Sequence, residues 1–139
     1  MFRGEFHYTL DEKGRVVLPP QFRRELGEAV IVTRGLDGCI WVYPQKAWDV
    51  VENVLRDLPL SRREFQRFLL APAREVEVDR QGRIALPEAL RESAEIGRDV
   101  VVIGLIKRLE IWSEVRWKKA VAKAERKAPE IAQEIDVSL

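Results

Sequence analysis

Two short motifs hold the residues of this sequence that are best suited to bind an anionic ligand. The first reads Asp11-Glu12-Lys13-Gly14-Arg15, and sixty-eight positions later Asp79-Arg80-Gln81-Gly82-Arg83 repeats its Asp, Gly and Arg. The planar guanidinium of arginine can hold a phosphate, or the edge of a guanine base, through two parallel hydrogen bonds. We therefore predict a nucleic-acid-binding surface made by six residues: Asp11, Lys13, Arg15, Asp79, Arg80 and Arg83.

A simpler explanation of the same residues needs no ligand. Arg15 could pair with Asp11, and Arg83 with Asp79, across the turn that each motif forms. An exposed ion pair of this kind contributes only about 0–1 kcal/mol to stability. Because that gain is small, stabilisation alone is a weak reason for the pair to occur twice, and the binding hypothesis is favoured.

Each motif also has the composition of a tight turn. Asp11 suits the first position, where its carboxylate can accept a backbone N–H, and Gly14 suits the left-handed position that closes the turn. The apolar-polar stretches at residues 5–10 and 15–18 flank this turn and predict a β-hairpin. Pro19 ends the second strand, because proline cannot donate a hydrogen bond to a neighbouring strand.

The similarity between the two motifs extends over most of the chain. Arg23 matches Arg91 at the same spacing, and after one extra residue the match continues from Gly35 and Gly104 to Trp48 and Trp117. This predicts a first repeat with a helical spacer over residues 1–72 and a second repeat with a C-terminal helix over residues 73–139. A unit of about 70 residues is marginally stable alone. The two repeats are therefore expected to fold together as one pseudo-symmetric α+β unit.

Apolar, β-branched stretches predict further strands in both halves, at residues 29–33, 39–43, 74–78, 99–103 and 108–112. Short helical turns are predicted at residues 21–26 and 87–93. Between the halves, the apolar residues over 48–58 follow the period of an amphipathic helix. The helical faces around Trp48 and Phe65 are candidates for either the core or a contact between subunits.

Caps and prolines predict where the longer helices begin and end. Ser61, with Glu64 three residues later, predicts the capping box of a helix that ends at Pro72. Ser113 predicts the N-cap of the last helix. Pro129 predicts a break in that helix, followed by a short helical or frayed tail.

Catalysis has little support in the sequence. His7 is the only histidine, so no second histidine can share a metal with it, and Cys39 lies among apolar strand residues, as a packed thiol does. Asp11 and Asp79 could form a carboxylate pair, but each has a turn-forming role that needs no catalysis. We expect no enzymatic activity, no metal site and no cofactor.

Composition and charge place few limits on the partner. The net charge of +1 neither requires nor excludes an anionic ligand, and the basic run over residues 116–127 is predicted to be a solvated helix face. No apolar run approaches the roughly 20 residues that cross a bilayer. Residues 1–5 lack the apolar segment of a signal peptide, so a cytoplasmic protein without a membrane partner is expected.

Several segments resemble the MraZ family of bacterial transcriptional regulators. They are the opening Met-Phe-Arg-Gly-Glu-Phe, the two Asp-x-x-x-Arg motifs, the Gly-Leu-Asp-Gly-Cys-Ile-Trp-Val-Tyr-Pro segment at residues 35–44, and Glu110-Ile111-Trp112. The likeness follows the family's order along essentially the whole chain. A single Asp-x-x-x-Arg motif would mean little, whereas this ordered set is specific.

The resemblance implies two AbrB-like swapped-hairpin halves, folded into one pseudo-symmetric β-barrel-like domain with peripheral helices. It implies a homo-oligomer, as a ring, that binds repeated boxes of double-stranded DNA upstream of its own operon. That operon is the bacterial division and cell wall gene cluster, which the family mainly represses, so a nucleoid-associated protein is expected. The family's DNA-binding motif falls on residues 11–15 and 79–83.

Two other functions fit parts of the same sequence. One is a ring-forming scaffold whose turn surface meets a protein partner. The other is an antitoxin, since AbrB-like folds also serve in that role. Two intact motifs in one chain, instead of one motif and a disordered toxin-binding tail, argue against the antitoxin.

Overall fold

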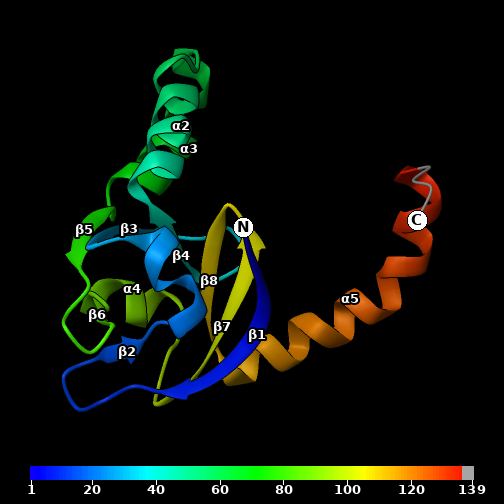
Figure 1. The fold of residues 1–139 in the computed structure, drawn as a ribbon. Helices are drawn as coiled ribbons and strands as arrows, with labels where there is room; N and C mark the ends of the chain where they lie inside the picture. Colours follow the sequence, from blue (N-terminus) through cyan, green and yellow to red (C-terminus); the bar gives the residue numbers. More distant parts are fainter. Residues whose placement is uncertain (136–139) are drawn as a thin grey trace.

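The computed structural model describes residues 1–135, which form an antiparallel sheet with helices around it (Figure 1). The predicted α+β class is confirmed. Six strands make the sheet in the order β1-β7-β8-β4-β3-β5, while β2 and β6 form a separate ribbon. The strands are β1 (Phe2–Thr9), β2 (Arg15–Val17), β3 (Ala29–Arg34), β4 (Ile40–Pro44), β5 (Arg74–Glu77), β6 (Arg83–Ala85), β7 (Asp99–Ile106) and β8 (Arg108–Ser113). The sheet is open, with β1 and β5 at its edges, and is not closed into a barrel.

Most strand pairing joins the two halves of the sequence. Of the six pairings in the described chain, β1–β7, β2–β6, β3–β5 and β4–β8 each connect a strand of the first half to one of the second. The predicted hairpin between residues 5–10 and 15–18 is therefore wrong in its pairing. Only the turn is local, closed by the Asp11 N–H, which donates to the Arg15 carbonyl at 3.0 Å. A two-stranded hairpin buries too little apolar surface alone, and pairing across the halves gives both strands a shared core.

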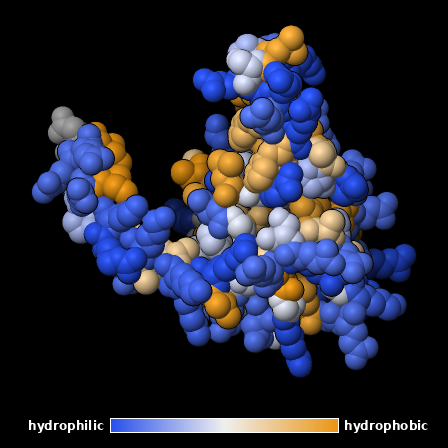
Figure 2. Space-filling model, turned by 180° about the vertical axis from the view of Figure 1, so that it is seen from behind, coloured by the Kyte–Doolittle hydropathy of each residue, from blue (hydrophilic) through white to orange (hydrophobic). Residues whose placement is uncertain are grey.

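Helices occupy the ends and the periphery of the sheet. They are η1 (Pro20–Phe22), α1 (Arg23–Leu26), α2 (Gln45–Arg56), η2 (Leu60–Arg62), α3 (Arg63–Leu70), α4 (Glu88–Ser93) and α5 (Glu114–Ile135). α2 and α3 lie side by side and project from the sheet, against which Trp48 of α2 and Leu69 of α3 pack, while α5 projects as a separate arm (Figures 1 and 2). None of the helices within residues 1–135 is both long and apolar enough to span a bilayer.

The caps agree with the sequence in one helix and differ in another. Ser113 caps α5 as predicted, because its Oγ accepts the Arg116 N–H at 3.1 Å. Ser61 instead lies within η2, and in the described chain no side chain caps α3. The turn after Pro59 bonds through its own backbone and leaves the serine no such role.

Pro129 does not end α5, which continues to Ile135. Proline removes one backbone hydrogen bond and bends a helix, and α5 changes direction in its C-terminal part (Figure 1). The remainder of the predicted tail, residues 136–139, lies outside the described residues.

Buried side chains pack on both faces of the sheet. Along β3, Val30 and Val32 face one cluster, while Ile31 faces the other. Coverage of both faces explains why the central strands are nearly continuous apolar runs. Trp48 belongs to the second cluster with 2% exposure, so it is a core residue, whereas Phe65 is 38% exposed.

Candidate nucleic-acid interface

The β2–β6 ribbon has one buried and one outer face. Val16 lies opposite Ile84 in the antiparallel register, and both side chains are fully buried in the core. Side chains alternate along a strand, so Arg15 and Arg83, each one residue from this central pair, belong to the opposite face. They occupy diagonal positions across the ribbon and are partly exposed.

Asp11 builds the first turn with both of its carboxylate oxygens. Its Oδ1 accepts the backbone N–H groups of Lys13 and Arg15, each at 2.9 Å, and its Oδ2 accepts Arg15 Nε at 2.6 Å. Gly14 follows with φ of +74°, a left-handed conformation that favours glycine. The aspartate therefore fixes the backbone of the turn and the arginine side chain together.

The second turn repeats these contacts. Asp79 Oδ1 accepts the N–H groups of Gln81 at 2.9 Å and Arg83 at 2.8 Å, and Oδ2 accepts Arg83 Nε at 2.9 Å. Gly82 has φ of +76°. The two motifs thus form matching turns, as their repetition in the sequence predicts.

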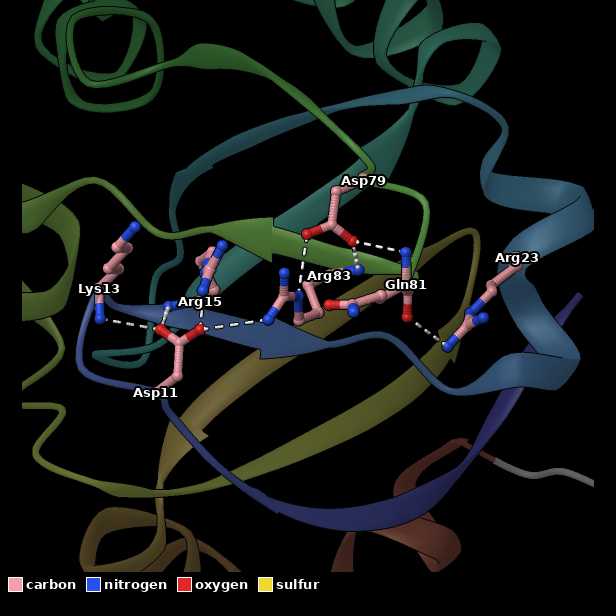
Figure 3. A network of polar contacts seen from close by, with 7 residues as sticks. All are labelled: Asp11, Lys13, Arg15, Arg23, Asp79, Gln81 and Arg83. Atoms are coloured by element: carbon pink, nitrogen blue, oxygen red, sulfur yellow. Dashed lines mark hydrogen bonds and ion pairs between the residues drawn. The ribbon is translucent and has the colours of Figure 1, made fainter.

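The pairing engages only one edge of each guanidinium. Arg15 is bonded to its aspartate through Nε, and within residues 1–135 no hydrogen bond engages its Nη1 or Nη2. Arg83 is also bonded through Nε, and its Nη1 lies 3.6 Å from Asp11 Oδ2, an ion pair between the halves (Figure 3). Most of the Nη donors are therefore left for an external acceptor.

The local hydrogen bonds also set the charge of the two aspartates. The backbone N–H of Arg15 is the main cause that lowers the pKa of Asp11, and the N–H of Arg83 does the same for the pKa of Asp79. Both carboxylates are therefore ionised at neutral pH. The two motifs carry four cations. Arg15 and Arg83 pair with the aspartates, and Lys13 and Arg80 are exposed.

The structure adds two basic residues that were not among the predicted site residues. Arg23 Nη2 donates to the carbonyl of Gln81 at 3.0 Å, and the Arg91 side chain lies against Gly14. The sequence held one signal for them, since Arg23 and Arg91 match in the repeat. Each nevertheless contacts the turn of the opposite half, which sequence spacing could not indicate.

The other candidates from the sequence do not join this surface. His7 Nε2 lies 2.7 Å from Glu5 Oε2 on an exposed part of β1. Cys39 is buried, and burial raises the pKa of its thiol well above the ordinary value, so the reactive thiolate is disfavoured. Residues 1–135 contain no cluster of three or more His, Cys, Asp or Glu side chains that could hold a metal ion.

Comparison with known proteins identifies the family. A family model described as "MraZ protein, putative antitoxin-like" matches residues 1–70 and again residues 69–136. The chain belongs to the MraZ family. Each of the two MraZ matches contains one Asp-x-x-x-Arg turn and one strand of the ribbon.

Three similar proteins each carry the name "Transcriptional regulator MraZ". The protein from Natranaerobius thermophilus is 49% identical over 138 residues, covering 97% of this chain and 96% of the relative. The one from Moorella thermoacetica is 50% identical over 122 residues, covering 86% and 85%. The one from Desulforamulus reducens is 47% identical over 138 residues, covering 97% of each.

Proposed function

We propose that this MraZ family member is a DNA-binding transcriptional regulator that contacts double-stranded DNA with the outer face of its β2–β6 ribbon. One observation carries the proposal: Arg15 and Arg83 are both fixed through Nε, which leaves most of their Nη donors for an external acceptor. The similar proteins named transcriptional regulators support it. No catalytic step forms part of the proposal.

Each residue of the surface has a distinct task in this proposal. Arg15 and Arg83 supply planar donors for phosphate oxygens or guanine edges, while Lys13 and Arg80 add charge beside them. A two-stranded ribbon is narrow enough to enter the major groove. The aspartates do not contact the DNA; they hold the arginines in place.

We further propose a ring-shaped homo-oligomer that binds repeated boxes upstream of its own operon, the division and cell wall gene cluster, mainly as a repressor on the nucleoid. One protomer offers few contacts, and joining several can raise affinity by about 10²–10⁴. Exposed apolar residues on the two projections are available for subunit contact. They include Val50, Val54, Ile131 and Ile135. Figure 2 shows apolar side chains on both projections.

The direct test is binding to a fluorescent duplex that contains the protein's own upstream DNA. Arg15→Ala/Arg83→Ala should weaken binding by about tenfold or more, because a bidentate base contact is worth about 1–3 kcal/mol. Arg3→Ala/Arg24→Ala is the matched control, since it removes the same charge from exposed positions on β1 and α1, outside the ribbon and both projections. It should bind like the wild type.

Oligomeric state and circular dichroism are measured on all three proteins, so that a folding defect is recognised. If the folded Arg15→Ala/Arg83→Ala protein binds as tightly as the wild type, the ribbon is not the DNA-binding surface. If the ribbon instead meets a protein, as in a scaffold or an antitoxin, removing the two arginines would leave binding to the duplex unchanged. The antitoxin is a relevant alternative outcome because the description of the family includes the word antitoxin-like.

A further inference from the structure

Arg23 and Arg91 each cross from one half of the molecule to the turn of the other. Arg23 begins α1 in the first half, yet its Nη2 donates to the carbonyl of Gln81 in the second turn at 3.0 Å (Figure 3). Arg91 lies on α4 in the second half, and its guanidinium lies against the first turn. A Cβ added to Gly14 would be 2.8 Å from Arg91 Cζ.

The glycines of the two turns make room for these guanidinium groups. A Cβ on Gly82 would overlap the Arg23 guanidinium, just as one on Gly14 would crowd Arg91. A glycine at this position therefore meets two requirements, a left-handed φ and a close approach by an arginine from the opposite half. In both turns the crossing arginine covers the residue that directly precedes Arg15 or Arg83.

Neighbouring core residues hold both crossing arginines in place. Phe22, directly before Arg23, packs edge-on against Phe2 at 5.1 Å and Phe6 at 5.4 Å between ring centroids. Leu90, directly before Arg91, is buried in the same cluster. Each arginine therefore extends to its turn from a fixed point on the core.

Side-chain contacts also restrict the two guanidinium groups. Arg91 Nε donates to the Leu86 carbonyl at 3.0 Å. Arg23 Nε is buried and meets no acceptor among residues 1–135, so this edge of the group is turned away from solvent.

We propose that Arg23 and Arg91 are positioning residues, each of which clamps the Asp–Arg turn of the opposite half. The consequence for DNA rests on the proposed function, whereas the clamp itself rests on the contacts above. Each arginine therefore acts on the turn of the half to which it does not belong. Arg23 stands eight positions after Arg15 in sequence, yet it controls the turn that presents Arg83.

The clamp is tested by amide hydrogen exchange of the full chain, followed by NMR. Arg23→Met keeps an apolar side chain of similar length and removes the guanidinium. It should accelerate exchange at Gln81, Gly82 and Arg83 by about threefold or more, and leave the first turn unchanged. Arg91→Met should accelerate exchange in the first turn and leave the second turn unchanged. Equal acceleration at both turns, or none at either, would overturn the assignment.

A second variant separates geometry from charge. Arg23→Lys keeps the positive charge and loses the planar fork that covers the glycine and reaches the carbonyl. The lysine should leave the second turn about as exposed to exchange as the methionine does. Full protection in Arg23→Lys would show that charge alone suffices and would overturn the clamp.

Double-mutant cycles connect the clamp to DNA binding. The effects of Arg23→Met and Arg83→Ala on affinity should be non-additive, because both act through the second turn. Those of Arg23→Met and Arg15→Ala should add. If Arg23→Met is instead additive with Arg83→Ala and non-additive with Arg15→Ala, the assignment of Arg23 to the second turn is wrong. If Arg15→Ala and Arg83→Ala leave affinity unchanged while the crossed exchange pattern is seen, the proposed function fails and the clamp remains.

Discussion

Within each turn the carboxylate and the arginine have complementary tasks. Asp11 accepts two backbone N–H groups and the Nε of Arg15, so one side chain holds both the turn and its cation. A pair made through both Nη atoms would occupy the donors that a phosphate needs, whereas a pair through Nε leaves them available. Stabilisation and binding are therefore compatible uses of the same residues. The sequence could name the residues of the pair, but not the edge of the guanidinium that forms it.

The two aspartates should make stability fall in acid. Their pKa is lowered in the folded state, first by the backbone N–H groups of Arg15 and Arg83, from an ordinary value of 3.8. A depressed carboxylate contributes stability above the unfolded pKa and loses it as pH falls through the folded pKa. The free energy of unfolding should thus decline below about pH 4.

Urea unfolding between neutral pH and about pH 2 measures this decline. Asp11→Asn/Asp79→Asn should be less stable at neutral pH and should show a smaller decline in acid, because it lacks the two titrating groups. Carboxyl titration by NMR gives an independent result. Midpoints at or above 3.8 for both aspartates would contradict the hydrogen bonding described for the turns.

Substitution of the turn glycines should be costly. Gly14→Ala and Gly82→Ala place a Cβ on a left-handed backbone, at about 1–2 kcal/mol each, and also crowd the crossing arginines. Gly97→Ala is the control, because an added Cβ there meets nothing within 4 Å. Gly97→Ala should change the free energy of unfolding by less than about 1 kcal/mol. Thermal unfolding compares the three, and an equal cost at all positions would remove the special role of the turns.

Among the secondary-structure elements, periodicity predicted most strands and helices but not their partners. Residues 5–10 and 15–18 look like the arms of one hairpin, yet β1 pairs with β7 and β2 with β6. Local spacing reports which side of a strand is apolar, while partner choice depends on burial across the whole core. The same limit explains Ser61, whose cap signal is overridden by the backbone turn after Pro59.

Two serines with similar sequence signals should differ in their effect on stability. Ser113→Ala removes the hydrogen bond from the Arg116 N–H to the serine Oγ and should cost about 1 kcal/mol. Ser61→Ala removes no cap and should change the free energy of unfolding by less than about 0.5 kcal/mol. Chemical denaturation of the two variants checks this. A larger loss for Ser61→Ala would mean that its side chain caps α3 after all.

For the molecule as a whole, we propose that the two halves unfold as one cooperative unit. Four of the six strand pairings in the described residues join them. Far-UV circular dichroism and tryptophan fluorescence should therefore give coincident urea transitions. A fragment of residues 1–72 alone should remain unfolded, because its strands lack their partners. Two separate transitions, or a folded fragment, would contradict the proposal that the two halves unfold together.

The repeat predicted the pseudo-symmetry of the molecule but not the crossing of its parts. A matched pair such as Arg23 and Arg91 shows that both halves use an arginine at this place. It cannot show which turn the arginine contacts, because both assignments satisfy the same symmetry. Only the packing of α1 and α4 beside the ribbon resolves that choice.

The salt dependence of DNA binding decides whether the ribbon meets the phosphate backbone. Affinity for the upstream duplex is measured over a series of salt concentrations for the wild type and for Arg15→Ala/Arg83→Ala. If these arginines bind phosphates, the slope of log affinity against log salt becomes shallower by about 0.9 for each phosphate that the variant leaves unbound. We predict weaker binding and a shallower slope for the variant. Coincident lines from two folded proteins of equal oligomeric state would contradict the proposal that the ribbon binds DNA.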